Sequence, residues 1–168
     1  EVEASTDVLD YHETLARLLE FQIEDFKGIL KVMDGKPVII RLLDPPLHEF
    51  LPPHDELLVD VTKLRLAKEH SDELEPKEHL LAMIEEMQEV NPMLGLRGCR
   101  LGLMYGAINE MQAKAIFTAS AELVLEGFDP KPEIMVPLVG HVNELRLVRL
   151  EIEAVGAAVQ EHLGVEIP

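Results

Sequence analysis

The stretch Lys36-Pro-Val-Ile-Ile-Arg-Leu-Leu-Asp-Pro-Pro-Leu-His-Glu-Phe-Leu-Pro-Pro53 decides how this chain folds. Within it, Val38–Leu43 is an apolar run that is too short for a helix and that begins with β-branched residues. Asp44-Pro45-Pro46 closes the run, because successive prolines cannot continue a hydrogen-bonded strand or helix. The sequence therefore predicts a buried strand that ends in a rigid turn.

Arg41 is the one charged residue inside this apolar run. Alternation places Ile39, Arg41 and Leu43 on one face of the strand, so the guanidinium shares that face with two apolar neighbours. A cation in such surroundings needs a counter-charge, because buried ions are normally paired. Two alternatives follow: Arg41 forms a structural ion pair with a carboxylate of the protein, or it binds an anionic ligand.

The composition is that of one globular domain, with 168 residues of which 47% are hydrophobic. The chain holds 15 lysines and arginines against 32 aspartates and glutamates, which gives a formal net charge of −17. Such a field repels nucleic acid and anionic membranes, so neither is expected as a partner. Any anionic ligand must be held by local cations.

Cysteine usage and the ends of the chain give two further expectations. A single cysteine, Cys99, excludes an intramolecular disulfide, and no apolar run approaches the roughly 18 residues of a membrane span. Together with seven methionines, this favours a reduced, cytoplasmic protein. Because the chain opens at Glu1 without methionine and stops within an apolar segment that could begin another strand, Val165–Pro168, we expect a piece of a longer protein.

Helical and strand patterns alternate along the chain. Helices are predicted where apolar residues recur at intervals of three and four, and strands where short apolar runs occur. This alternation favours an α/β fold with parallel strands, right-handed crossovers and helices outside the sheet. The predicted helices are Asp10–Met33, Ile108–Glu126 and Val142–Leu163, and the predicted strands are Val38–Leu43, Leu94–Arg97 with an extension to Leu101, and Ile134–Pro137.

The charged section 45–92 is predicted to be a helical insertion with helices at Val59–Lys68 and Pro76–Val90. Its histidines do not favour a metal site, because no pair of potential ligands has a recognised spacing on a fixed helix. The potential ligands considered are His48, His54, His70 and His79, with Asp44, Glu49 and Asp55.

The segment Asn91–Gly102 combines three glycines with Arg97 and Arg100. Glycines at this density allow the backbone to approach a ligand closely, but the segment lacks the pattern of a P-loop or of a dinucleotide fingerprint. In an extended segment the two arginines would have opposite parity, so at most one could point where Arg41 points. Cys99 lies among small and apolar residues, which favours an inert core thiol over a nucleophile.

These motifs together resemble the pyruvate, phosphate dikinase family over nearly the whole chain. The string Leu-Leu-Asp-Pro-Pro-Leu-His-Glu-Phe separates that family from relatives such as phosphoenolpyruvate synthase. The resemblance rests on Phe21-Gln-Ile-Glu-Asp-Phe26, Arg41-Leu-Leu-Asp-Pro-Pro-Leu-His-Glu-Phe-Leu-Pro52, Asn91-Pro-Met-Leu-Gly95, Arg97-Gly-Cys-Arg-Leu-Gly102, Met111-Gln112 and Pro132-Glu-Ile-Met-Val-Pro-Leu138.

The resemblance implies that residues 1–168 are part of the C-terminal, phosphoenolpyruvate-binding TIM-barrel domain of such an enzyme. The fold class would be a partial (β/α)8 barrel with about three parallel strands. Arg41 and Arg97 match the family's two arginines that contact the phosphoryl group. The intact enzyme would interconvert ATP, phosphate and pyruvate with AMP, diphosphate and phosphoenolpyruvate, using a phosphohistidine domain as its partner and assembling as a homodimer.

The resemblance also implies what this segment does not carry. The family's Mg²⁺ ligands and the cysteine that protonates the enolate lie on later strands, and Cys99 does not match that cysteine. We therefore expect no catalytic residue and no metal ligand here, and an isolated chain without activity. The alternatives are a truncated, non-catalytic module for oligomerisation or anion binding, and a piece of the related phosphoenolpyruvate synthase.

Overall fold

The computed structural model describes residues 2–45, 52–67, 73–87 and 95–167. It divides the chain into two compact units. The first unit comprises Glu1–Asp44 and Gly98–Pro168, and the second comprises Pro45–Arg97. The sequence predicted a helical insertion over 45–92, and the second unit consists of helices and loops in its described residues.

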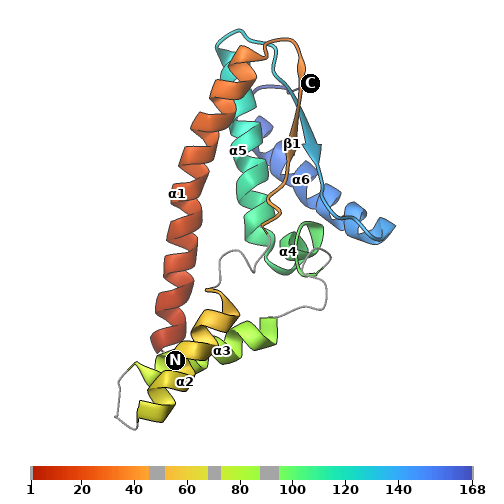
Figure 1. Cartoon of the computed structure of the whole chain (residues 1–168). Helices are drawn as coiled ribbons and strands as arrows, with labels where there is room; N and C mark the ends of the chain where they lie inside the picture. Colours follow the sequence, from red (N-terminus) through yellow and green to blue (C-terminus); the bar gives the residue numbers. More distant parts are fainter. Residues whose placement is uncertain (1, 46–51, 68–72, 88–94, 168) are drawn as a thin grey trace. The chain divides into compact units, whose positions relative to one another are not determined.

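The first unit contains a sheet of two parallel strands, β1 (Pro37–Arg41) and β2 (Lys131–Met135) (Figure 1). Ile39 pairs with Glu133, and Arg41 pairs with Met135. The backbone N–H of Leu42 extends the pairing by donating to the carbonyl oxygen of Met135 at 3.0 Å. The predicted parallel direction of the first and last strands is confirmed, but they pair directly with each other, whereas three parallel neighbouring strands were expected.

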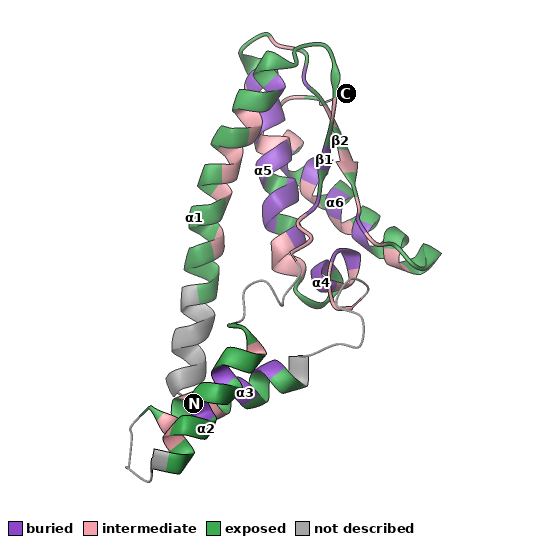
Figure 2. Cartoon of the chain, viewed as in Figure 1, coloured by how far each residue is buried: buried purple, intermediate pink, exposed green. Residues whose placement is uncertain are grey.

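The described residues of this unit also form the helices α1 (Val2–Val32), α4 (Cys99–Met104), α5 (Gly106–Leu125) and α6 (Val142–Leu163). Figure 2 shows buried residues concentrated on α5, which packs against α1 on one side and α6 on the other. Ala113, Ala115 and Ala119 of α5 are fully buried, because their small side chains let both neighbouring helices approach closely. The bounds of α5 and α6 agree with the predicted ones within two residues. Helix α1 ends one residue before its predicted end but begins eight residues earlier than predicted.

Side chains alternate along β1 as predicted, but the two faces have the opposite roles. Ile40 and Leu42 are buried toward the helices, and Leu42 belongs to a core cluster with Cys99, Ala113, Val148 and Ile152. On the other face Ile39 is 61% exposed, and Arg41 is exposed as well. The prediction that Arg41 shares a buried face is therefore wrong for this chain, because no described element covers that face of the two-stranded sheet.

The predicted middle strand is absent from the described part of the chain. Residues 95–97 are irregular, and α4 begins at Cys99, while Leu94 lies outside the described residues. Gly98 is in the left-handed region with φ 58°, which turns the chain out of an extended path. Because this segment is not extended, the expectation that Arg97 and Arg100 point to opposite faces of a strand does not apply. Residues 165–167 form no strand either, and the Ile167 N–H donates to the side chain of Gln160 at 2.8 Å.

The second unit contains the helices α2 (His54–Ala67) and α3 (Leu74–Met87), which pack against each other. Their apolar residues Leu57, Val61, Leu81 and Ile84 form one cluster. Both helices begin earlier than predicted, and Pro76 is the third residue of α3 rather than the first. Among the residues that the structure describes, no helix is long and apolar enough to cross a membrane. The described fold is mixed α/β, mostly helical, with two parallel strands.

Candidate functional site

Polar side chains of the first unit gather where β1 and β2 end. Arg41 is the last residue of β1, and Asp44 lies in the segment that follows it. The loop after β2 leads into α6 with Glu144, and α4 carries Arg100. In folds built from parallel strands, ligands bind at the carboxyl ends of the strands, because loops rather than packed helices meet there. This end of the sheet is the candidate site.

Arg41 and Asp44 form an ion pair at this end of the sheet. The guanidinium Nη2 lies 2.5 Å from Oδ2 of Asp44. The carboxylate side chain is only 6% exposed, whereas the arginine side chain is 53% exposed. The structural ion pair that the sequence left open therefore exists. A guanidinium has five N–H donors, so an arginine that is half accessible can also receive an anion from solvent.

Gln112 of α5 holds the backbone on both sides of Leu42. Its Oε1 accepts the N–H of Leu43 at 2.7 Å, and its Nε2 donates to the carbonyl oxygen of Arg41 at 3.3 Å. The glutamine is only 4% exposed, and both ends of its amide are engaged. Because buried polar groups need partners, this arrangement satisfies the helix side chain and the strand end together.

Gly98 brings the start of α4 against the loop after β2. The N–H of Cys99 donates to the carbonyl oxygen of Pro137 at 3.0 Å, and the Cys99 thiol donates to the carbonyl oxygen of Leu138 at 3.3 Å. Cys99 is 1% exposed, and burial, with the Glu144 carboxylate as a second cause, raises the pKa of its thiol. A protonated thiol is a poor nucleophile, which agrees with the predicted core role.

Glu144 organises the loop that enters α6. Its Oε2 accepts the N–H of Gly140 at 2.7 Å and that of His141 at 3.0 Å, and its Oε1 lies 3.5 Å from Nε of Arg100. The two backbone donors and then Arg100 lower the pKa of the Glu144 carboxyl. Leu138 in this loop has φ 58°, an uncommon value for a residue other than glycine. The loop is thus held in one conformation by α4 and α6.

Arg97 lies at the end of the second unit, directly before Gly98. Its side chain is partly buried, and its N–H donates to the carbonyl oxygen of Gly95 at 2.9 Å. Arg41 belongs to the first unit, so the two arginines predicted to contact the phosphoryl group lie in different units.

Two of the four histidines in the charged section, His54 and His79, lie within the described residues. His54 contacts Asp55 at 3.2 Å and Glu85 at 3.6 Å, and His79 is exposed. His48, His70 and Glu49 lie outside the described residues. Within the described ranges, no three side chains of histidine, cysteine, aspartate or glutamate gather as metal ligands. We assign no reaction step to Mg²⁺ in this segment.

The contacts of Gln112 and Glu144 were not predicted from the sequence. Glu144 had a detectable signal, because a polar residue followed three positions later by glutamate, just before a periodic apolar run, is typical of a helix start. Here His141 takes the position of the usual Ser or Thr. Gln112 had no detectable signal, because a single glutamine within an apolar helix does not indicate which distant backbone groups it contacts.

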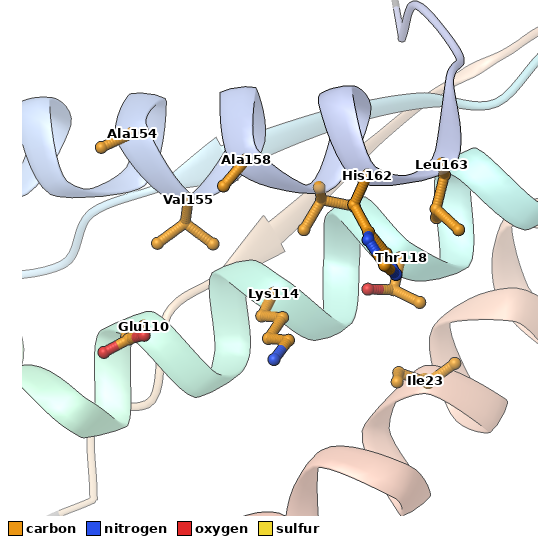
Figure 3. A pocket seen from close by; sticks show the side chains of 10 residues that line it. Ile23, Glu110, Lys114, Thr118, Ala154, Val155, Ala158, His162 and Leu163 are labelled. Atoms are coloured by element: carbon orange, nitrogen blue, oxygen red, sulfur yellow. The ribbon is translucent and has the colours of Figure 1, made fainter.

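A groove of about 720 Å³ lies among the helices of the first unit (Figure 3). Lys114 of α5 and Val155 and His162 of α6 line it, and Ile23 of α1 lies at one side. None of the strand-end residues Arg41, Asp44 or Gln112 lines this groove. It is therefore separate from the candidate site.

Comparison with known proteins identifies the family. Residues 4–167 match the family described as PEP-utilising enzyme, PEP-binding domain. The chain belongs to this family. It is 44% identical over 155 residues to pyruvate, phosphate dikinase of Entamoeba histolytica, and 48% identical over 156 residues to the chloroplastic enzyme of Flaveria trinervia. These matches cover 92% and 89% of this chain.

A third relative, pyruvate, phosphate dikinase of Giardia intestinalis, is 45% identical over 153 residues, or 91% of this chain. The resemblance to dikinases that the motifs indicated is thus confirmed. The chain spans only 15% to 17% of the length of these three relatives. Since one of these relatives is named chloroplastic, the cytoplasmic location expected from cysteine usage stays a prediction.

Proposed function

We propose that this chain is the phosphoryl-binding part of a pyruvate, phosphate dikinase, with Arg41 as a ligand for the phosphoryl group of phosphoenolpyruvate. The half-exposed guanidinium of Arg41 at the carboxyl end of β1, anchored by the buried carboxylate of Asp44, is the observation that carries this proposal. Arg97, which follows the same family resemblance, is proposed as the second cation.

The physical argument concerns the charge of the transferred group. A phosphoryl group moving between a histidine and an enolate oxygen spreads negative charge over its oxygens, and guanidinium groups stabilise this charge through paired hydrogen bonds. The chain carries a net charge of −17, so anion binding depends on cations fixed at one place. The ion pair with Asp44 fixes the position of Arg41, and the arginine side chain remains 53% exposed and accessible to an anion.

The wider architecture follows from the same family membership. We propose that β1 and β2 are neighbouring strands of a (β/α)8 barrel, with α1, α5 and α6 on the outside. The exposed face with Ile39 and Arg41 would then point to the barrel interior. The Mg²⁺ ligands, the proton donor and the phosphohistidine domain would be supplied by parts of the enzyme outside this segment.

The two half-reactions of the intact enzyme test this function. Arg41→Lys and Arg97→Lys keep the charge but lose the planar fork, so each should lower phosphoryl transfer between the phosphohistidine and pyruvate by roughly a hundredfold. Phosphorylation of the histidine by ATP should stay near normal. Single-turnover assays of each half-reaction measure the two effects separately.

A matched control is Arg149→Lys, which also removes an arginine fork from a carboxylate pair but lies on the exposed surface of α6. It should leave both half-reactions unchanged. Equal losses in both half-reactions, or no loss in the pyruvate half, would show that Arg41 and Arg97 are structural and would favour a non-catalytic role for this segment.

A further inference from the structure

The contacts of Gln112 go beyond satisfying a buried amide. At the end of β1, the carbonyl oxygen of Met135 in β2 accepts the N–H of Leu42 at 3.0 Å. The carbonyl oxygen of Arg41 and the N–H of Leu43, on either side of Leu42, both bind the Gln112 side chain instead. The Gln112 side chain therefore makes, at the end of β1, the two backbone hydrogen bonds that a neighbouring strand would otherwise make.

This arrangement fixes three successive residues before the turn. The Leu42 side chain is 2% exposed and packs in the cluster that contains Ala113, the residue after Gln112. The peptide groups on both sides of Leu42 are bound to the same helix through one amide. The path of the chain from Arg41 to Asp44, and so the geometry of their ion pair, is set by α5.

We propose that Gln112 is a positioning residue, which orients the Arg41–Asp44 pair for phosphoryl binding by holding the Arg41 carbonyl and the Leu43 N–H. This inference rests on the proposed function of Arg41. Anion binding by an arginine fork depends on orientation, because both hydrogen bonds must be aligned at once. An apolar residue at position 112 would leave both backbone groups unpaired and the pair free to reorient.

Two substitutions separate positioning from packing. Gln112→Met has a similar volume and loses both hydrogen bonds, whereas Gln112→Glu at pH 7.5 keeps an acceptor for Leu43 but loses the donor to Arg41. Ser120→Ala is the matched control, because Ser120 is fully buried on the same helix and its hydroxyl donates only to the carbonyl oxygen of Ile116 at 2.8 Å.

The measurements are amide hydrogen exchange at Leu43, the NMR signal of the Arg41 Nε–H, and titration with phosphoenolpyruvate at low ionic strength. Gln112→Met should speed exchange at Leu43 about tenfold, because this N–H loses its one hydrogen bond to the glutamine. It should also broaden the Arg41 signal and weaken binding about tenfold. Gln112→Glu should preserve protection at Leu43 but still disturb Arg41. Ser120→Ala should change none of the three.

Unchanged Leu43 exchange and an unchanged Arg41 signal in both Gln112 variants would overturn the inference, and so would equal effects from Ser120→Ala. The proposed function fails separately. A wild-type chain that does not respond to phosphoenolpyruvate, while the Leu43 and Arg41 signals respond to Gln112→Met, would overturn phosphoryl binding by Arg41 and support the role of Gln112 in orienting it.

Discussion

Gly98 lies so close to the carbonyl oxygen of Pro137 that a methyl group on its Cα would be 2.8 Å from that oxygen. The same methyl group would lie 3.3 Å from Oδ1 of Asp44. The start of α4 thus packs closely against the loop after β2 and against the carboxylate that holds Arg41. This contact is why a glycine is required here, in addition to its φ of 58°.

Gly98→Ala should therefore destabilise the protein by about 2 kcal/mol or more, since it combines a strained backbone with overpacking. The matched control is Gly164→Ala, because Gly164 has φ 67° but no atom within 4 Å of an added methyl group. It should cost only about 1 kcal/mol. Urea unfolding followed by circular dichroism measures both. If both variants lose the same free energy of unfolding, the backbone near Pro137 can move to accommodate the added methyl group without cost.

Glu144 should make stability depend on pH. Its pKa is lowered by the N–H groups of Gly140 and His141, and then by Arg100. A carboxyl with a lowered folded-state pKa stabilises the fold above its unfolded pKa of about 4.3, and this contribution is lost as pH falls through the folded value. Glu144→Ala should thus lower the free energy of unfolding at pH 7, and the difference from wild type should shrink toward pH 3.

The control for this effect is Glu153→Ala, which removes an exposed ion pair with Arg149 on the same helix. Exposed pairs of this kind contribute little to stability. Urea midpoints at pH 7, 5 and 3 give the comparison. A loss in Glu144→Ala that stays constant across this range would show that the carboxylate charge is not what holds the loop.

The sequence predicted the long helices and the parallel strand pair because their signals are local and repeated. Apolar spacing located α1, α5 and α6, and the short run before Asp44 located β1. The predicted strand at Leu94–Arg97 was wrong in its described residues, because apolar runs interrupted by glycine fit both a strand and a tight turn into a helix. The positive φ of Gly98 decided between them.

The candidate site was predictable only in part. Arg41 stood out because it was a cation in an apolar run, and either partner considered for it was an anion. Its actual partner, Asp44, is three residues away, but Gln112 lies 71 residues from Arg41 and reaches it only through the packing of α5 against the sheet. Long-range polar contacts of this kind leave no periodic signal in one sequence.

The isolated chain should self-associate. Ile39 is 61% exposed and Met135 is 43% exposed on the described strands, and each of these strands pairs with only one neighbour among the described residues. Open strand edges and exposed apolar faces favour association. Ile39→Lys should weaken association and reduce binding of an apolar dye more than Val142→Lys, which changes a 72% exposed residue on α6. A compact monomer at all concentrations in sedimentation experiments would contradict this.

The isolated chain should bind phosphoenolpyruvate weakly and should not convert it to pyruvate. Arg41 and Arg97 supply positive charge, but the family's metal ligands and proton donor are expected outside this segment. Two cationic contacts against a net charge of −17 should give an affinity no tighter than about millimolar, once the entropy lost on association is counted. Phosphorus NMR measures both binding and turnover in one sample.

The salt and mutant dependence of this weak binding identifies the group responsible. Binding should weaken with rising ionic strength, and it should be lost in Arg41→Gln but kept in Arg149→Gln, since Arg149 pairs with Glu153 on the exposed side of α6. Equal binding in both variants would mean that the anion binds elsewhere or without specificity. Pyruvate formation that disappears in Arg41→Gln would contradict the expectation that catalysis requires residues outside this chain, because 168 residues would then contain the proton donor as well.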